Sequence, residues 1–168
     1  MSLKKCSILP QIMPHIHYAV DFTVEVFIVY KNKVLLRKHD KYKVWLSVGG
    51  HIELNEEPNE AAVREVREEV GLEVQLDATL LANRPEDDTK ELIPPYYLNC
   101  NRVGEFHRHV TFVYFARAKS DKIEQTIKRE RVKDCRWFTK EEIEKNTELK
   151  PNVRFYALEA LKKLSESV

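Results

Sequence analysis

The sequence predicts an α/β fold in which helices cover both faces of a mixed β-sheet. Two observations carry this prediction. Short apolar segments with the composition and alternation of strands occur in both halves of the chain. They are interleaved with two segments of helical periodicity, one central and one close to the C-terminus.

We expect one domain over residues 1–168, with residues 1–18 as an N-terminal extension. The length of 168 residues lies within the usual range of a single domain, and no Gly/Ser/Pro-rich linker divides the chain. With 43% hydrophobic and 33% charged residues, the composition is typical of a chain that folds around a core.

The first strands are predicted at residues 23–30 and 33–38, which are rich in Val, Ile, Phe and Leu. Lys31 and Asn32 between them supply the two-residue turn of a β-hairpin, although neither is glycine. A further short strand is predicted at residues 45–48, before two consecutive glycines.

Later strands are predicted at residues 74–81, 110–118 and 135–138. Residues 82–106 contain three prolines and several polar residues, so most of this stretch is predicted to be a loop, with one strand at residues 96–101. The order of the strands in the sheet does not follow from these patterns.

The central helix is predicted from Pro58 to Val70. Asn55 or Glu57 lies near its start, and Gly71 is placed as its C-terminal stop. Pro151 opens the second helix. Both segments show apolar residues at helical spacing, at Ala62, Val63, Val66 and Val70 in the first and at Val153, Ala157, Ala160, Leu161 and Leu164 in the second.

The charge balance limits the kind of partner. The chain has 28 Lys and Arg against 27 Asp and Glu, which gives no overall field for nucleic acid polymers or an anionic membrane surface. The longest apolar stretch, Val26 to Tyr30, is too short to span a bilayer. We therefore expect a small molecule as partner, with a homodimer left open.

The three cysteines, Cys6, Cys100 and Cys135, are odd in number, widely spaced and lack a C-x-x-C pair. This pattern indicates neither a disulfide framework nor a zinc knuckle. A reducing compartment fits such cysteine usage, so we expect a cytoplasmic location.

The central helix carries a cluster of carboxylates. At roughly 100° per residue, Glu65, Glu68 and Glu69 fall within about 100° of one another, beside the apolar arc. Such carboxylates repel one another unless a cation lies among them, and hard oxygen ligands suit Mg²⁺ or Mn²⁺ rather than zinc or copper. Taken alone, the same segment also fits a solvated acidic surface with Glu/Arg pairs.

The segment from Gly50 to Leu72 reads GHIELNEEPNEAAVREVREEVGL. It resembles the Nudix box, which is a glycine, five residues, a glutamate, seven residues, then Arg-Glu-apolar-x-Glu-Glu-x-Gly-apolar. A chance match to all of these positions is rare, which favours the functional interpretation over a solvated surface. The fixed positions are filled by Gly50, Glu56, Arg64, Glu65, Val66, Glu68, Glu69, Gly71 and Leu72.

The resemblance extends beyond the box. The segments Val34-Leu35-Leu36-Arg37 and Arg136-Trp137-Phe138, the latter followed by residues 139–142, look like family landmarks, as does Trp45. One departure is Val48, which stands where many members have a proline before the two glycines.

The resemblance implies a Nudix-type α/β/α sandwich with a mixed β-sheet. It also implies hydrolysis of a phosphoanhydride bond in a nucleoside diphosphate linked to another moiety, with Mg²⁺ or Mn²⁺ as cofactor. By the same resemblance, Glu68 and Glu69 are metal ligands and Glu65 is a third ligand or a base. The backbone carbonyl of Gly50, or of Gly49, is a further candidate ligand.

Two other roles are implied by the resemblance. Arg64 and Glu56 would form a supporting ion pair that orients the helix and the loop before it. Glu130 lies near the place of a late catalytic glutamate and is a secondary candidate for the base.

Other functions of the fold remain as alternatives. A non-catalytic sensor of nucleotides or ADP-ribose commonly lacks the paired glutamates, which are present here. The isomerase branch needs a cysteine/glutamate constellation that the three cysteines do not assemble. Among enzymes, oxidised nucleoside triphosphates, ADP-ribose, dinucleoside polyphosphates and nucleotide sugars all stay open as substrates.

Arg37 and Glu53 are candidates for substrate contact, each with a second interpretation. Arg37 ends a predicted strand, where family members often bind phosphate, but a strand-end arginine is commonly solvated. Glu53 would contact the substrate, or a metal through water, or would only pair with Arg64.

The loop before the long strand at residues 110–118 supplies four further candidates. His107 and His109 share one face of a strand, but no third soft ligand is apparent, so they are predicted to contact the substrate or to be satisfied strand histidines. Tyr96 and Tyr97 offer faces on which a base stacks, or they pack on the sheet.

Overall fold

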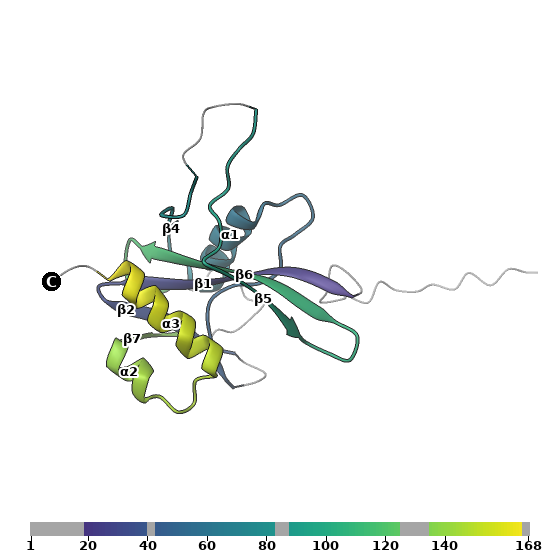
Figure 1. Ribbon diagram of the computed structural model, residues 1–168. Coiled ribbons are helices and arrows are strands. Elements are labelled where there is room, and N and C mark those ends of the chain that lie inside the picture. The colour runs from purple at the N-terminus through teal and green to yellow at the C-terminus, as the bar shows by residue number, and fades with distance from the viewer. Residues whose placement is uncertain (1–18, 40–42, 83–87, 125–134, 166–168) are drawn as a thin grey trace, which may run out of the picture.

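The computed structural model describes residues 19–39, 43–82, 88–124 and 135–165. This part of the chain forms a mixed sheet with helices on both sides (Figure 1). In chain order the elements are β1 (Val20–Tyr30), β2 (Lys33–Lys38), β3 (Trp45–Leu46), α1 (Pro58–Val70), β4 (Val74–Leu76), β5 (Tyr97–Arg102), β6 (Arg108–Ala118), β7 (Cys135–Phe138), α2 (Lys140–Lys145) and α3 (Pro151–Leu164).

The sheet is built around two parallel strands. Its order is β3-β2-β1-β6-β4, with β5 also paired to β6 and β7 to β2. β1 and β6 run parallel from the pair Val20 and Arg108 to the pair Val29 and Arg117, while the other pairings are antiparallel. Parallel strands need a long crossover, and here the crossover contains α1. The predicted mixed sheet is confirmed.

The predicted hairpin of β1 and β2 is also confirmed. Lys31 and Asn32 have φ angles of 44° and 59°, the left-handed values that a type I′ turn requires at both central residues. Asparagine tolerates this conformation because its short polar side chain bonds locally, whereas lysine adopts it at a cost of about 1–2 kcal/mol. The pairing of the two strands offsets that cost.

Alternation along β1 sends its side chains to two different layers. Val24, Val26 and Ile28 are buried in a cluster with residues of α1, and Phe27 and Val29 in a second cluster with residues of α3. Figure 1 accordingly shows α1 and α3 on opposite sides of the sheet, with α2 close to α3. The predicted α/β/α sandwich is therefore confirmed.

The ends of the two long helices follow the predicted signals. α1 begins at Pro58, after a capping box formed by Glu57 and Glu60, and Gly71 at its C-terminus has a φ of 67°. α3 begins at Pro151. A left-handed residue directly after the last turn closes the helix by its own backbone bond, which is why glycine marks this position.

The short helix α2 was not predicted. The sequence predicted two helices, and the described residues form three. Six residues are too few to show an apolar period, and Ile143 is the buried residue of α2. A signal for it does exist in the sequence. Thr139 and Glu142 form a capping box, with the Thr139 side chain accepting from the Glu142 amide.

Two predicted strands are shorter than expected. The strand predicted at residues 74–81 ends at Leu76, because Asp77 turns its carboxylate to the Tyr96 hydroxyl and the backbone closes a turn from Ala78 to Leu81. The strand predicted at residues 45–48 ends at Leu46, since the chain then crosses toward β1 and Val48 bridges to Val26.

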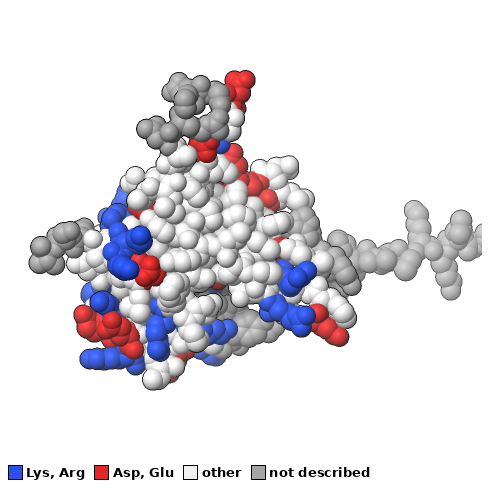
Figure 2. All heavy atoms as spheres, viewed as in Figure 1, with Lys and Arg blue, Asp and Glu red and all other residues white. Residues whose placement is uncertain are grey.

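The surface shown in Figure 2 has basic and acidic side chains in small separate groups around a mainly uncharged area. No helix in the described ranges combines the length and the apolar character needed to cross a membrane.

We expect Gly71→Ala to destabilise the protein. Alanine in the left-handed region costs about 1–2 kcal/mol, and a Cβ at Gly71 would lie only 2.1 Å from the carbonyl oxygen of Glu124. Gly104→Ala is the matched control, because a Cβ there meets no atom within 4 Å. Urea unfolding should show a loss of more than about 1 kcal/mol for the first variant and a change within about 0.5 kcal/mol for the second. Equal stability of the two variants would contradict this account of the helix end.

Candidate active site

The carboxylates of α1 lie on the arc of the helix that does not face the core. Val66 and Val70 are fully buried against the sheet and fix the rotation of the helix. The side chains of Glu65 and Glu69 are 13% and 11% exposed, whereas Glu68 is 42% exposed. Two carboxylates are therefore enclosed by protein, and the third lies at the solvent boundary.

The two glycines before the helix allow its carboxylates to touch the backbone. The amide of Gly49 donates to Glu69 Oε2 at 3.0 Å. Gly49 has a φ of 152°, and a Cβ there would lie 2.0 Å from the carbonyl oxygen of Val24. A Cβ at Gly50 would lie 2.4 Å from Glu65 Oε1. Gly49 is therefore required by the backbone of β1, whereas a side chain at Gly50 would displace the carboxylate of Glu65.

The carbonyl of Gly50 has a partner in β1. It accepts from the Val24 amide at 2.9 Å, as in a strand pairing. A carbonyl oxygen has two lone pairs, so this bond leaves one for another partner. The role of Gly50 as a metal ligand stays a prediction.

Arg64 connects the helix to the loop before it. Its Nε and one terminal nitrogen donate to the two carboxylate oxygens of Glu56, at 2.6 and 3.0 Å. The same guanidinium donates to Glu65 Oε1 at 2.9 Å, to Glu68 Oε2 at 3.3 Å and to the backbone carbonyl of His51 at 2.9 Å. The ion pair of Arg64 with Glu56, expected from the sequence, is present.

These contacts shift the acidity of the groups involved. The hydrogen bond from Arg64 lowers the pKa of Glu56, and the same bond raises the pKa of the arginine. Burial raises the pKa of Glu65, and the positive charge of Arg64 opposes that rise. Glu65 therefore differs from Glu56 in its electrostatic setting, although one guanidinium touches both.

Arg37 is buried beside the enclosed glutamate. Only 8% of the residue is exposed, its Nε donates to the Ser47 carbonyl at 3.2 Å, and its terminal nitrogen lies 2.8 Å from Glu69 Oε1. The alternative of a solvated strand-end arginine is therefore wrong. Its guanidinium lies beside the carboxylate cluster, where it would also pair with an approaching phosphate.

Comparison with known proteins agrees with this geometry. Residues 21–159 match the family model of the NUDIX domain. The chain belongs to the Nudix family. Comparison with curated proteins gave no match.

Solved structures of Nudix proteins share the fold. A hydrolase of the NUDIX family from Clostridium perfringens has 37% sequence identity and a TM-score of 0.74, over 86% of this chain and 98% of that one. A MutT NUDIX hydrolase from Burkholderia pseudomallei has 18% identity and a TM-score of 0.62, over 88% and 100% of the two chains. The MutT protein from Methanosarcina mazei Go1 has 17% identity and a TM-score of 0.63, over 88% and 97%. The predicted enzyme class, a Nudix-type pyrophosphohydrolase, is confirmed by the family match and the similar hydrolase.

Two predicted residues of the Nudix site lie apart from this cluster or outside the described part of the chain. Glu53 is exposed, and its backbone amide donates to Glu56 Oε2 at 3.0 Å. Arg64 pairs with Glu56, which lies on the same loop as Glu53. Glu130 lies outside the described residues, so its role as a base stays a prediction.

Tyr96 and Tyr97 pack into the α3 side of the fold. The ring of Tyr96 stacks on Phe115 with centroids 4.4 Å apart, and its hydroxyl donates to Asp77. The hydroxyl of Tyr97 donates to Glu159 of α3 at 3.2 Å. These contacts favour the packing alternative for both rings, and stacking on a base stays a prediction.

His107 and His109 have a neighbour that the sequence did not reveal. His107 lies just before β6 and His109 within it, and both approach Asp21 of β1. Asp21 is a carboxylate and not a soft ligand, but it offers a third ligand atom beside the two imidazoles. Asp21 escaped notice because it is far away in the sequence and becomes adjacent only through the parallel pairing of β1 and β6.

Glu25 is a further group at the site that was not predicted from the sequence. It lies in β1 near Ser47 and Arg37, and burial raises its pKa. Its Oε2 atom is buried without a hydrogen-bond partner among the described residues. A single glutamate inside the otherwise apolar run from Val24 to Tyr30 was the available signal.

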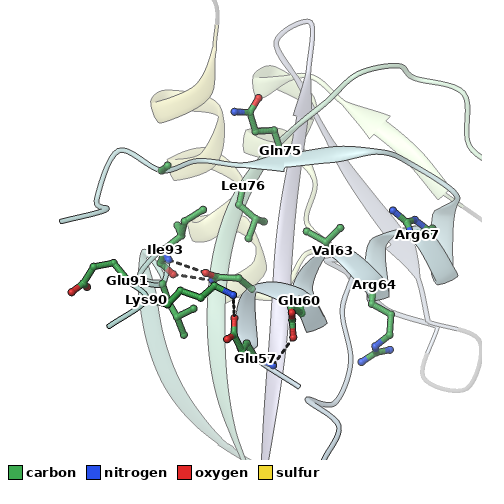
Figure 3. Close-up of a pocket in the computed structure, with 13 residues that line it drawn as sticks. Glu57, Glu60, Val63, Arg64, Arg67, Gln75, Leu76, Lys90, Glu91 and Ile93 are labelled. Atoms are coloured by element: carbon green, nitrogen blue, oxygen red, sulfur yellow. Dashed lines mark hydrogen bonds and ion pairs between the residues drawn. The ribbon is translucent and has the colours of Figure 1, made fainter. Parts of the chain in front are cut away.

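A cavity of about 660 Å³ lies beside α1, between the helix, β4 and the segment that contains Ile93 (Figure 3). Asn59 ties that segment to the helix through bonds to the Ile93 carbonyl and amide, at 2.9 and 2.8 Å. The cavity is lined by Arg64 but not by the three glutamates Glu65, Glu68 and Glu69.

We expect Glu56→Gln to destabilise the protein in a way that depends on pH. The pKa of Glu56 is depressed in the folded state, so its ion pair stabilises the fold above the unfolded pKa, and this contribution is lost as the pH falls through the folded pKa. The variant should lose about 1–2 kcal/mol of stability at neutral pH. This difference from wild type should shrink when the pH falls below 4.5, the ordinary pKa of a glutamate. Urea unfolding at neutral and at acidic pH measures both quantities.

Glu53→Gln is the control for this prediction, because Glu53 is an exposed glutamate of the same loop. Its stability should stay within about 0.5 kcal/mol of wild type. A loss in Glu56→Gln that is equally large at acidic pH would show that charge is not the cause.

Proposed function

We propose that this Nudix hydrolase cleaves a phosphoanhydride bond in a nucleoside diphosphate linked to another moiety, with Mg²⁺ or Mn²⁺ as cofactor. The observation that carries the proposal is that arginines and backbone hold the three glutamates of α1: Arg64 contacts Glu65 and Glu68. Glu69 contacts Arg37 and the Gly49 amide. Such a set of fixed negative and positive groups matches the charges of a metal-bound diphosphate.

The donor set fits a hard divalent cation. All the side-chain donors are carboxylate oxygens, which Mg²⁺ and Mn²⁺ prefer, and Glu65 and Glu69 are already oriented by Arg64 and the Gly49 amide. Glu68 and Glu69 are the proposed ligands, and Glu65 a third ligand or the base. When bound, the cation neutralises diphosphate oxygens and lowers the pKa of bound water.

The chain's own residues position the substrate. Arg37 is held by Glu69 and by the Ser47 carbonyl, so its guanidinium is already in place before a substrate binds. Arg64 keeps the loop and the helix together through Glu56 and the His51 carbonyl. The complete set of carboxylates supports an enzyme rather than a non-catalytic sensor, because a sensor has no need of fixed groups for the cleaved bond.

The nature of the partner is part of the proposal. A small nucleotide-derived molecule is the proposed substrate, without a role for nucleic acid polymers or membranes. The homodimer and the cytoplasmic location stay predictions from the sequence. A panel of oxidised nucleoside triphosphates, ADP-ribose, dinucleoside polyphosphates and nucleotide sugars, assayed for phosphate, pyrophosphate and nucleoside monophosphate, tests the substrate class.

Metal removal should abolish turnover. The carboxylates have no means of stabilising transition-state charge without a cation, so excess EDTA should stop product release from every substrate of the panel, and Mg²⁺ or Mn²⁺ should restore it. Turnover that persists in excess EDTA would exclude the proposed cofactor. Binding of a panel compound without turnover, at saturating Mg²⁺, would instead support the sensor.

Glu69→Gln should lose activity without loss of the fold. The change removes one charge from the cluster while Val66 and Val70 keep the helix packed, and kcat/KM should fall by on the order of a hundredfold or more. Glu60→Gln is the matched control on the same helix, because Glu60 is exposed and glutamine also serves in its capping box. Unchanged kcat/KM in a folded Glu69→Gln protein would exclude the role assigned to this residue.

A further inference from the structure

A second group of metal-ligating side chains lies at the start of the two central strands. Asp21 of β1 and His109 of β6 are direct partners in the parallel ladder. The next pair on the same face, Thr23 and Thr111, joins its hydroxyls at 2.8 Å, which shows that side chains of both strands meet there. His107 enters from the turn before β6, where its carbonyl accepts from the Val103 amide at 3.0 Å.

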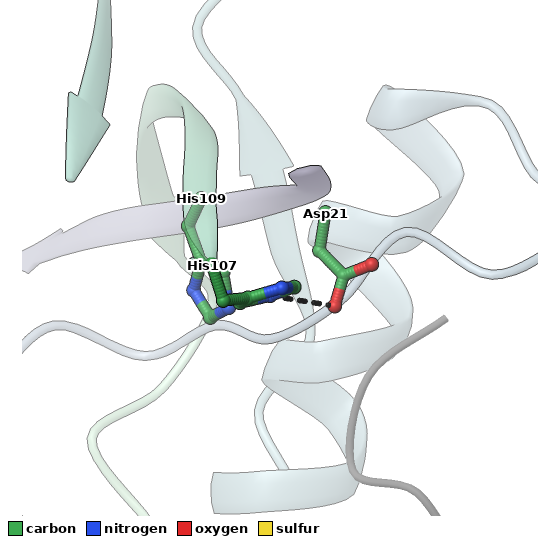
Figure 4. Close-up of side chains that lie close together, drawn as sticks. All are labelled: Asp21, His107 and His109. Carbon is green, nitrogen blue, oxygen red and sulfur yellow. Dashed lines mark ion pairs between the residues drawn. The ribbon is translucent and has the colours of Figure 1, made fainter. Parts of the chain in front are cut away.

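We propose that Asp21, His107 and His109 form a binding site for a divalent transition metal, represented by Zn²⁺. One ligand atom from each residue lies within 4.8 Å of the others. Figure 4 shows the three side chains approaching one another from β1, from β6 and from the segment before it. The site shares no residue with the carboxylates of α1 and goes beyond the hydrolase function.

The distance between His107 and Asp21 fits coordination of one ion. His107 Nε2 lies 3.3 Å from Asp21 Oδ2. A charge-assisted hydrogen bond between such groups is about 2.7–2.9 Å long. Two ligand atoms of a tetrahedral zinc site, each about 2.0–2.1 Å from the ion, lie about 3.4 Å apart. His107 and Asp21 are thus separated by about the distance between two zinc ligands, and His109 offers a ligand atom within 4.8 Å of both.

Burial and donor chemistry point to the same kind of ion. Asp21 is 0% exposed, and the imidazoles of His51 and His107 lie 3.3 Å from its Oδ2 atom, so its carboxylate faces nitrogen ligands inside the protein. Two imidazoles with one carboxylate suit zinc and other first-row transition metals, whereas Mg²⁺ prefers oxygen ligands only. The donor set therefore distinguishes this site from the all-carboxylate cluster of α1.

His51 lies at the border between the two sites. Its Nε2 is 3.3 Å from Asp21 Oδ2, and its ring centroid is 4.9 Å from that of His109. Its backbone carbonyl accepts from Arg64, and the neighbouring Ile52 amide donates to the Phe22 carbonyl at 2.9 Å. An ion held by Asp21 would thus lie next to the loop on which the Nudix box begins.

The test is metal binding measured under conditions that fill the carboxylate cluster. Protein freed of metal by chelation is placed in excess Mg²⁺ and titrated with Co²⁺, whose visible absorption reports nitrogen and oxygen ligands, and then with Zn²⁺ in equilibrium dialysis. We expect one Zn²⁺ per chain that Mg²⁺ does not displace. We also expect Co²⁺ absorption that Zn²⁺ removes.

The variants decide which residues hold the ion. His107→Gln, His109→Gln and Asp21→Asn should each weaken Zn²⁺ binding by more than about a hundredfold, which exceeds the loss typical of residues that only orient a ligand. His39→Gln, a histidine outside the group, and Glu68→Gln on α1 are the controls and should keep wild-type affinity. His107 lies outside the strands, so its variant is expected to fold even if Asp21→Asn does not, and circular dichroism checks this.

The outcomes separate this proposal from the hydrolase function. Absence of Zn²⁺ binding in excess Mg²⁺, or equal affinity in wild type and His107→Gln, would overturn the site. Equal loss in Glu68→Gln would also overturn it, by showing that the ion is held by α1. Hydrolysis measured in the same preparations reports on the Nudix box alone.

Discussion

One guanidinium joins three of the carboxylates of the Nudix box, Glu56, Glu65 and Glu68. Arg64 donates to Glu56 on the loop, to Glu65 on its own helix and to the backbone of the residue after Gly50. A guanidinium is planar and holds its donors in fixed directions, so it satisfies all these acceptors in one arrangement only. The loop and the first turns of the helix are thereby oriented as a unit.

Two independent constraints hold that unit against the sheet. Burial of Val66 and Val70 fixes the rotation of α1, because a turn of the helix would expose apolar surface. The close approach of Gly49 to the backbone of Val24 fixes the loop, because a side chain there would meet the carbonyl. Apolar packing thus sets the helix and steric fit sets the loop, while Arg64 joins the two.

Features determined by neighbours in the sequence were predicted well. The limits of α1 follow from Pro58 and Gly71, and the hairpin turn from Lys31 and Asn32, since each depends on the backbone preferences of a few adjacent residues. The carboxylate cluster was predicted for the same reason. Its members share one helix, so their relative directions follow from helical geometry.

Features determined by strand pairing were not predicted. Asp21 meets His109 only because β1 and β6 pair in one particular register, and a shift by one residue would turn Asp21 to the other face of the sheet. The half-buried Glu25 owes its position to the same ladder, beside Ser47 and Arg37 from other segments. The alternation along β1 is also obscured, because both of its faces are covered and apolar residues occupy consecutive positions.

The pairing of β1 with β6 also bears on how the protein reaches this structure. Thr23 and Thr111, which join the two strands, are 88 positions apart in the chain, and contacts of such separation form slowly because a long loop must close first. The loop of the Nudix box contacts β1, through the bond from the Val24 amide to the Gly50 carbonyl, and α1, through Arg64. The group of Asp21, His107 and His109 needs β6 as well. We therefore expect the two clusters to be assembled at different stages of folding, the carboxylates with the early local contacts and the histidines with the late closure of the sheet.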